Sequence, residues 1–319
     1  MKTVLIGSFP TCFPLIDYLK NQLNLIGVCT EQKEILDSKN NAIELFNDIE
    51  LLYINKSILN NELNVWLTSK QPDLVLVCGC SLKIPPQLLT IPTFGFLNIH
   101  FGSLPENKGP NPIFWSIKNG EAKTKISIHR ISNEWDSGDI LMEKSFDMIA
   151  GETSGILNSK LSYGAVHMIS ECLALIPDKN NFKPQFENEI SKYNKRPTEQ
   201  ERTINWKNQD AEEIENLVNA CNPVYGGAIT YYQSTAVRIL EVSPVKTQIH
   251  YNGKNAGEII HASPQDGLFV ICRDNQILRI NILSSDAGIL SGNKYAGLGV
   301  IAGQRFTTFL EEKIELQLK

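Results

Sequence analysis

Four short apolar runs in the first third of the chain are typical of buried strands. They cover residues 2–6, 25–30, 73–78 and 94–99, and polar or turn-forming residues bound them. Between the first two, residues 14–23 place apolar side chains at helical spacing. Because strands that alternate with helices favour parallel pairing, we expect an α/β fold with a doubly wound, mostly parallel, Rossmann-like sheet.

Further elements are predicted around and beyond this pattern. The polar stretch from residue 31 to about residue 48 has a helix-forming composition. Residues 124–132 alternate apolar and polar side chains, so we expect a half-buried strand there, with residues 139–148 as its neighbour. Residues 154–176 keep helical periodicity throughout and predict one long helix.

A change in composition marks the end of this region. Residues 178–203 are polar and contain two prolines, which makes them the best candidate for a domain boundary. Beyond them a helix is predicted over 211–223, and several short apolar runs with turn signals then predict a small, OB-like β-barrel. We therefore expect a first domain at 1–180, a linker at 181–203 and a smaller barrel domain at 204–319.

Composition narrows the function classes. The 319 residues carry a formal net charge of −5, so no global electrostatic field attracts nucleic acid. The seven cysteines are scattered without a Cys-x-x-Cys pair, so we expect reduced thiols and no bound metal. The apolar N-terminus is too short for a signal peptide, and no run approaches the roughly 18 apolar residues of a membrane span. We therefore expect a soluble, cytoplasmic protein.

Two polar residues mark the end of the fourth apolar run. Asn98 and His100 lie two positions apart, so on a strand their side chains point to the same face, at the strand's carboxyl end. In open parallel sheets, that edge is where ligands bind. A turn-forming stretch further along the chain supplies Asp136. The first strand–helix turn has neither a dinucleotide fingerprint nor a P-loop pattern, so neither of these nucleotide sites is expected.

An amide, an imidazole and a carboxylate together suit acyl transfer to a nitrogen nucleophile. Attack of an amine on a formyl carbon creates an oxyanion, to which the Asn98 amide can donate a hydrogen bond. His100 can carry the proton from the attacking amine to the leaving nitrogen. A nearby Asp136 would orient the imidazole and raise its pKa. Because the amine attacks directly, this chemistry requires no nucleophilic side chain.

These motifs resemble those of the formyltransferases that use 10-formyltetrahydrofolate. The family pattern is an Asn-x-His strand, a Leu-Pro loop with a later Gly-x-x-Pro, and an Asp-x-Gly turn. Here the four parts are residues 98–100, 103–105, 109–112 and 136–138, in the same order and with similar separation. The resemblance extends over most of the chain, including segments similar to the C-terminal domain of methionyl-tRNA formyltransferases: 193–206, 222–228 and 302–306.

The resemblance implies roles for specific residues. Asn98, His100 and Asp136 would be catalytic, and 10-formyltetrahydrofolate would be the co-substrate. The pterin ring would lie against the backbone of two loops. The residues implied in folate binding are Cys80, Ser81, Leu82, Lys83, Ile84, Asn133, Glu134 and Trp135.

The formyl acceptor stays open at this point. The C-terminal resemblance favours the amino group of methionyl-tRNA, with initiator tRNA as a partner. Trp115 and the pair His129–Arg130 look more like formyltransferases that act on a nucleotide-linked amino sugar. Deformylation by water is a third possibility. From Trp206 onward there are twelve acidic and ten basic side chains, whereas a module that binds tRNA is more commonly basic.

His129 is not expected to take part in the chemistry. It lies on the alternating strand, where the pattern predicts a half-exposed histidine with ordinary hydrogen bonds.

Overall fold

The computed structural model divides the chain into two compact units. It describes residues 1–33, 46, 49–57, 59, 61–186, 191–233, 235–247, 251 and 253–308. The first unit consists of Met1–Pro112, Lys123–Asp147 and Asn158–Lys195, and the second of Ile113–Ala122, Met148–Leu157 and Arg196–Lys319. The predicted helical stretch after residue 31 lies largely outside the described residues.

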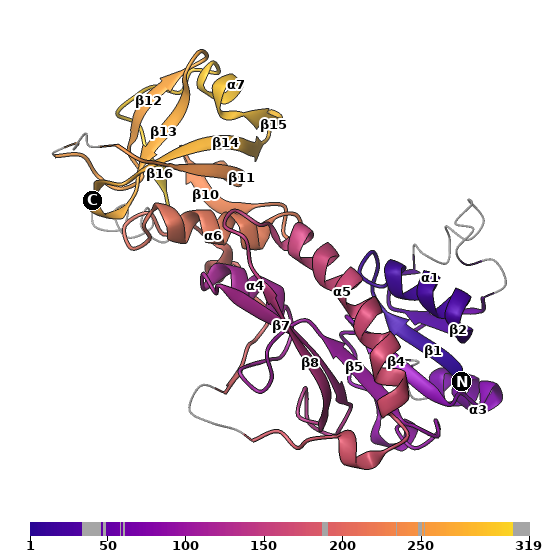
Figure 1. Cartoon of the computed structure of the whole chain (residues 1–319). Helices are drawn as coiled ribbons and strands as arrows, with labels where there is room; N and C mark the ends of the chain where they lie inside the picture. Colours follow the sequence, from indigo (N-terminus) through magenta and orange to yellow (C-terminus); the bar gives the residue numbers. More distant parts are fainter. Residues whose placement is uncertain are drawn as a thin grey trace. The chain divides into compact units, whose positions relative to one another are not determined.

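The first unit is built on a seven-stranded sheet (Figure 1). Its strand order is β3-β2-β1-β4-β5-β7-β8, in which β3 to β5 pair in parallel and β7 and β8 are antiparallel. The α/β fold with a parallel central sheet, predicted from the sequence, is therefore confirmed. The strands of this unit are β1 (Lys2–Gly7), β2 (Asn24–Thr30), β3 (Leu51–Tyr53), β4 (Leu74–Cys78), β5 (Phe96–His100), β6 (Asn107–Lys108), β7 (Lys123–Arg130), β8 (Ile140–Asp147) and β9 (Lys192–Tyr193).

The strand order creates a switch point next to the candidate residues. From β1 the chain proceeds outward to β2 and β3, and it then returns to the other side of β1 as β4 and β5. Loops after β1 and β4 therefore diverge at the carboxyl edge of the sheet, which is the usual ligand position in such folds. Asn98 pairs with Val77 near the end of β4, so β5 brings Asn98 and His100 to the same edge.

Helices cover both faces of the sheet. On one face, Leu63 and Trp66 from helix α3 belong to a buried cluster with Val4 and Val75 from the strands. On the other face lies helix α5, where a Cβ added at Gly164 would come 2.6 Å from the Phe146 ring. The helices up to this point in the chain are α1 (Phe13–Gln22), α3 (Glu62–Lys70), α4 (Pro112–Lys118) and α5 (Ser154–Leu175).

The prediction of a half-buried β7 is wrong. Residues Ile126–His129 are all buried, although the sequence alternates in polarity. The reason is that β7 is an interior strand, paired with β5 on one side and β8 on the other. The side chains of Ser127 and His129 are consequently buried polar groups, which require hydrogen-bond partners.

The second unit contains an antiparallel sheet that curls on itself. Its order is β12-β13-β14-β11-β10-β16, with β15 paired to β14. The Ile259 nitrogen donates to the Gln304 carbonyl (2.8 Å) and the Gly303 nitrogen to the Ile259 carbonyl (2.8 Å), which joins β12 at one edge to the segment leading into β16 at the other. The elements are α6 (Ala211–Cys221), β10 (Ala228–Tyr232), β11 (Thr235–Val245), β12 (Ile259–Ser263), β13 (Gly267–Ile271), β14 (Ile277–Ser285), β15 (Gly288–Ser291), α7 (Gly292–Ala296) and β16 (Phe306–Thr307).

Helix α6 shows how directly the sequence can specify an element. Asp210 accepts a hydrogen bond from the Glu213 nitrogen (2.9 Å), and the Glu213 carboxylate accepts one from the Asp210 nitrogen (2.9 Å), which forms a capping box. The helix begins at the predicted Ala211 and ends at Cys221, two residues before the predicted end, because the Asn-Pro pair stops it.

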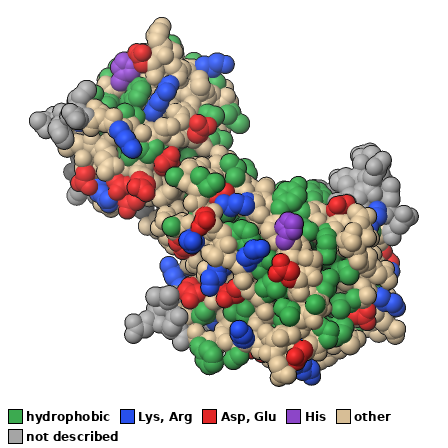
Figure 2. Space-filling model, viewed as in Figure 1, with side chains coloured by type: hydrophobic (Ala, Val, Ile, Leu, Met, Phe, Trp, Pro, Cys, Tyr) green, Lys and Arg blue, Asp and Glu red, His purple; other side chains and the backbone are tan. Residues whose placement is uncertain are grey.

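Three further observations concern the surface, the cysteines and the helices. In the view of Figure 2, acidic and basic side chains are intermixed rather than gathered by sign. All seven cysteines are free thiols. None of the helices in the described part of the chain is both long enough and apolar enough to cross a membrane.

Candidate active site

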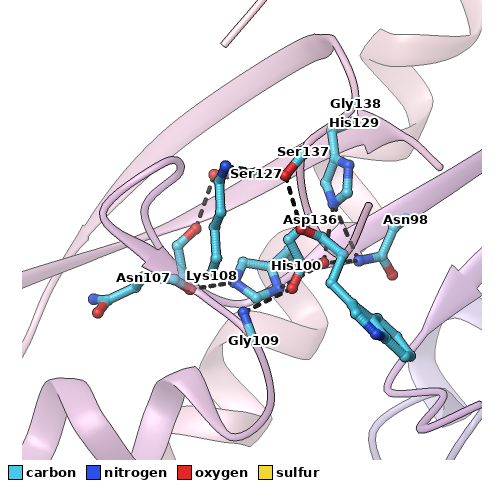
Figure 3. Close-up of polar contacts among 12 residues, drawn as sticks. Asn98, His100, Asn107, Lys108, Gly109, Ser127, His129, Asp136, Ser137 and Gly138 are labelled. Atoms are coloured by element: carbon cyan, nitrogen blue, oxygen red, sulfur yellow. Dashed lines mark hydrogen bonds and ion pairs between the residues drawn. The ribbon is translucent and has the colours of Figure 1, made fainter. Parts of the chain in front are cut away.

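The structure brings Asn98, His100 and Asp136 together (Figure 3). The Asn98 amide nitrogen donates to Asp136 Oδ1 over 3.2 Å, and His100 Nδ1 lies 3.7 Å from the same oxygen. His100 is only 6% exposed, whereas Asn98 is partly exposed. The group predicted from the sequence thus forms one cluster in which the Asp136 carboxylate contacts both other side chains.

Backbone geometry explains how Asp136 reaches the sheet edge. It lies in the turn between β7 and β8 with a φ of 49°, a left-handed conformation that Asp tolerates better than most residues. Gly138 lets this turn pack closely on β7, since a Cβ there would lie 2.0 Å from the Arg130 carbonyl oxygen. On the other side, the Gly109 nitrogen donates to Asp136 Oδ2 over 2.8 Å.

Asp136 is ionised. Burial alone would raise its pKa, but the neighbouring His100 and the hydrogen bond from the Gly109 nitrogen are among the contacts that hold the pKa well below its usual range. The carboxylate is therefore an acceptor of hydrogen bonds at neutral pH.

His100 has one nitrogen occupied and one available. Its Nε2 lies 2.8 Å from the Asn107 carbonyl oxygen, which can only accept, so Nε2 carries the proton and Nδ1 has the free lone pair. Burial lowers the pKa of His100, and this effect outweighs the opposing effect of Asp136. The expectation that Asp136 would raise the pKa is correct for the direction of that contribution and wrong for the net shift.

His129 is a member of this cluster, which sequence reasoning missed. It is 1% exposed, not half-exposed, and its Nε2 lies 3.1 Å from the Asn98 nitrogen and 3.5 Å from Asp136 Oδ1. The observation that could have revealed His129 is the antiparallel register, in which Asn98 on β5 and His129 on β7 are direct partners. Directly opposed residues share one face of a sheet, so pairing the two predicted strands would have identified it.

The loop after β5 contacts both His100 and Asp136. Asn107 supplies the carbonyl that holds His100, and Gly109 supplies the amide that holds Asp136. Lys108, only 6% exposed, donates to the Ser137 hydroxyl over 3.0 Å. This loop therefore connects the end of β5 to the turn that carries Asp136.

Part of the predicted linker packs on these same loops. The Gln185 amide nitrogen donates to the carbonyls of Asp136 (2.9 Å) and Gly138 (2.7 Å), so one side chain holds two residues of the turn. The buried Asn194 donates through its backbone nitrogen to the Lys108 carbonyl and through its side chain to Asn107 Oδ1. Two residues of the described linker thus support the site.

We expect Gln185→Glu to lower kcat about 10-fold, because a 1 Å misplacement of a reacting group can cost up to about 100-fold. The substitution keeps the shape but replaces the amide donor with a carboxylate that faces two carbonyl oxygens. The turn that carries Asp136 should then move. Gln185→Met removes the donor without adding charge and should show the smaller loss; equal turnover in all three proteins would contradict the supporting role.

The implied folate residues occupy two surface loops. In the loop after β4, the Ser81 backbone nitrogen and hydroxyl both donate to the Glu31 carboxylate (2.6 and 2.5 Å). Ile84 is buried in the core cluster and Lys83 is exposed. Cys80 is a neutral thiol, because burial raises its pKa to about 12, and its Sγ donates to the Leu82 carbonyl.

The second loop immediately precedes Asp136. Asn133, Glu134 and Trp135 are exposed, with Trp135 at 38%. The hydroxyl of Ser137 donates to the Trp135 carbonyl over 2.9 Å, which orders this part of the loop. Among the described residues, no group of His, Cys, Asp and Glu has the arrangement of a metal site.

Comparison with known proteins identifies the family of the chain. A family model described as "Formyl transferase" matches residues 14–173, and a second, "Formyl transferase, C-terminal domain", matches residues 197–296. A methionyl-tRNA formyltransferase of Nitrosomonas eutropha is 28% identical over 254 residues, which cover 79% of this chain and 78% of that protein.

Two solved structures share the fold. HypX from Aquifex aeolicus, in complex with tetrahydrofolic acid, has a TM-score of 0.64 at 18% identity; the match covers 93% of this chain but only 46% of HypX. WlaRD, a sugar 3N-formyl transferase solved in the presence of dTDP and 5-N-formyl-THF, has a TM-score of 0.62 at 18% identity, with 88% of this chain and 96% of WlaRD covered. Because one formyl transferase model matches the first part of the chain and a second model matches the last part, the chain belongs to the formyl transferase family of enzymes.

Proposed function

We propose that the protein transfers the formyl group of 10-formyltetrahydrofolate to a primary amine. The observation that carries this proposal is the convergence of Asn98, His100 and Asp136 at the carboxyl edge of the sheet. The family and the folate complexes of its structural neighbours support the choice of donor.

We infer from this geometry how the proton moves from the attacking amine to His100 and then to the leaving nitrogen. The amine nitrogen attacks the formyl carbon, and the carbonyl π electrons move to oxygen. His100 Nδ1, whose lone pair is available because Nε2–H is donated to Asn107, takes the proton from the attacking nitrogen. The imidazolium is then stabilised by ionised Asp136 and lies beside the new oxyanion. Collapse breaks the bond to N10 of the folate, which receives the proton from His100.

Folate binding is assigned to the two loops at the same edge. The loop of Cys80–Ile84 follows β4 at the switch point of the sheet, and the loop of Asn133–Trp135 leads directly into Asp136. Exposed backbone in these loops suits a flat pterin ring, because main-chain donors and acceptors can match its polar edge. Burial of Ile84 means that its backbone, not its side chain, would be the contact.

We propose methionyl-tRNA as the acceptor. Support comes from the C-terminal domain model, and from a methionyl-tRNA formyltransferase of similar length that matches across most of both chains. In this proposal residues 1–180 form the catalytic domain, 181–203 connect it to residues 204–319, and the latter, as an OB-like barrel, contact the acceptor. Hydrogen bonds that join the edges of the curled sheet favour the barrel description. The free cysteines favour a cytoplasmic location.

A nucleotide-linked amino sugar is the second candidate acceptor. It is favoured by the match to WlaRD, which covers nearly the whole of that sugar formyltransferase. From Trp206 onward the twelve acidic side chains also outnumber the ten basic ones, whereas domains that bind nucleic acid are commonly basic.

An acceptor panel with formyl-labelled 10-formyltetrahydrofolate tests these assignments. The expected result is labelled formylmethionyl-tRNA, with no label transferred to uncharged tRNA. Transfer to a nucleotide-linked amino sugar instead would replace the acceptor and keep the chemistry. Release of labelled formate without any acceptor would identify a hydrolase, and absence of all three products would refute formyl transfer.

A further inference from the structure

The two N–H groups of the Asn98 amide are both engaged by neighbouring side chains. One donates to Asp136 Oδ1 (3.2 Å), and the amide nitrogen lies 3.1 Å from His129 Nε2. An amide nitrogen carries two donors, so these contacts use its full capacity. In the expectation from the sequence, this NH₂ group donates a hydrogen bond to the oxyanion. The oxyanion would then have to compete with Asp136 and His129 for the two N–H groups.

The protonation of His129 follows from its other contact. Its Nδ1 lies 2.8 Å from the Arg130 carbonyl oxygen, which accepts hydrogen bonds only. Nδ1 therefore carries the proton, and in the neutral ring Nε2 is an acceptor directed at the Asn98 nitrogen. The contact is geometrically enforced, because Asn98 and His129 are paired residues on adjacent antiparallel strands.

The opposite orientation of the amide is electrostatically excluded. With the amide rotated by 180°, Asn98 Oδ1 would face both the ionised carboxylate of Asp136 and the lone pair of His129, and buried acceptors without donors are costly. In the observed orientation, none of the residues that the structure describes donates to Asn98 Oδ1. Asn98 is partly exposed, so this oxygen is the end of the amide left for a ligand.

We propose that His129 is a positioning residue that fixes the Asn98 amide with its nitrogen toward Asp136 and its oxygen free to accept a hydrogen bond from the attacking amine. The inference rests on the proposed formyl transfer and refines it. Asn98 Oδ1 holds one N–H of the amine and directs the nitrogen lone pair at the formyl carbon. His100 Nδ1 removes a proton from the same nitrogen. Stabilisation of the oxyanion then falls to the imidazolium of His100.

Two substitutions at one position separate this role from simple packing. His129→Gln can place its Oε1 near the position of Nε2 and keep the acceptor. His129→Asn keeps a donor near Nδ1 for the Arg130 carbonyl but cannot reach Asn98. We expect kcat to fall about 10- to 100-fold in the Asn variant, by loss of orientation, and to recover most of that loss in the Gln variant. KM for the folate donor should change little in either.

A measurement on the unsubstituted protein does not depend on the activity of any variant. Imidazole ¹⁵N NMR should show His129 with Nδ1 protonated and Nε2 bare at neutral pH. A scalar coupling across the hydrogen bond should link Nε2 to the Asn98 side-chain nitrogen, which is assigned by its loss in Asn98→Asp. A His129 ring protonated at Nε2 would overturn the proposal, as would equal losses in the Gln and Asn variants. If the unsubstituted protein transfers no formyl group while the coupling is present, the proposed function fails and the His129–Asn98 contact stands.

Discussion

Asp136→Asn is expected to lower kcat roughly 10³-fold, since removal of the carboxylate from a His–carboxylate pair can cost about 10⁴-fold. The isosteric amide still fits the left-handed backbone at this position, where φ is 49°. It no longer supplies negative charge 3.7 Å from His100 Nδ1, so the imidazolium formed during proton transfer loses its counter-ion. Single-turnover kinetics with labelled 10-formyltetrahydrofolate would measure the chemical step.

A second signature distinguishes this effect from a general distortion. Asp136 raises the pKa of His100 against the larger effect of burial. Its removal should therefore move the acid limb of the kcat/KM profile to lower pH while the plateau falls. Asp139→Asn is the matched control, since it makes the same change three residues away in the same hairpin, at an exposed carboxylate. Comparable losses in the two variants would argue against a specific role for Asp136.

His100→Ala should also reduce turnover about 10²- to 10⁴-fold, the usual contribution of a general base. In the proposed mechanism the ring removes the amine proton through Nδ1, and the carboxylate of Asp136 is not placed to replace it. Asp136 is ionised, but its Oδ1 faces the Asn98 amide and its Oδ2 accepts from Gly109. Product formation with a saturating acceptor would measure the loss.

The pH dependence follows from the direction of the shift. Burial lowers the pKa of His100 below the ordinary value of 6.5, so the neutral, active ring persists until the pH falls below that value. We expect activity in the unsubstituted enzyme to be lost only below pH 6.5, and this limb to disappear from the residual rate of His100→Ala. The exposed His167 on α5 provides the control. If His167→Ala and His100→Ala behaved alike, the assignment of the base would be wrong.

The local sequence was sufficient to predict the strand and the turn that position the site. The apolar run of β5 ends with Asn98 and His100, and period-two alternation on a strand puts both on one face whatever surrounds them. The turn containing Asp136 could also be read locally, because Gly138 and its polar neighbours are typical of hairpin connections. Helix α6 and the existence of several short strands in the second unit followed from the same short-range patterns, whereas helix α7 was not predicted.

Burial of β7 could not be read from its sequence. Its alternation predicts one exposed face, but burial depends on what covers that face, and this is decided by strands and loops distant along the chain. The first part of the predicted linker is a similar case. A polar segment between two apolar regions looks unstructured, yet Gln185 finds two carbonyl acceptors 47 and 49 residues away.

The sequence by itself determined the candidate groups of this protein and predicted that three of them would meet at one edge of a sheet. Only the tertiary structure decided how the Asn98 amide is oriented and which nitrogen of His100 carries the proton. The register of β5 against β7 placed His129 beside Asn98 and so fixed which end of the amide is free. The Asn107 carbonyl selected which nitrogen of His100 is basic. The physical reason is that hydrogen-bond direction and desolvation depend on partners brought together by folding, and no local pattern encodes those partners.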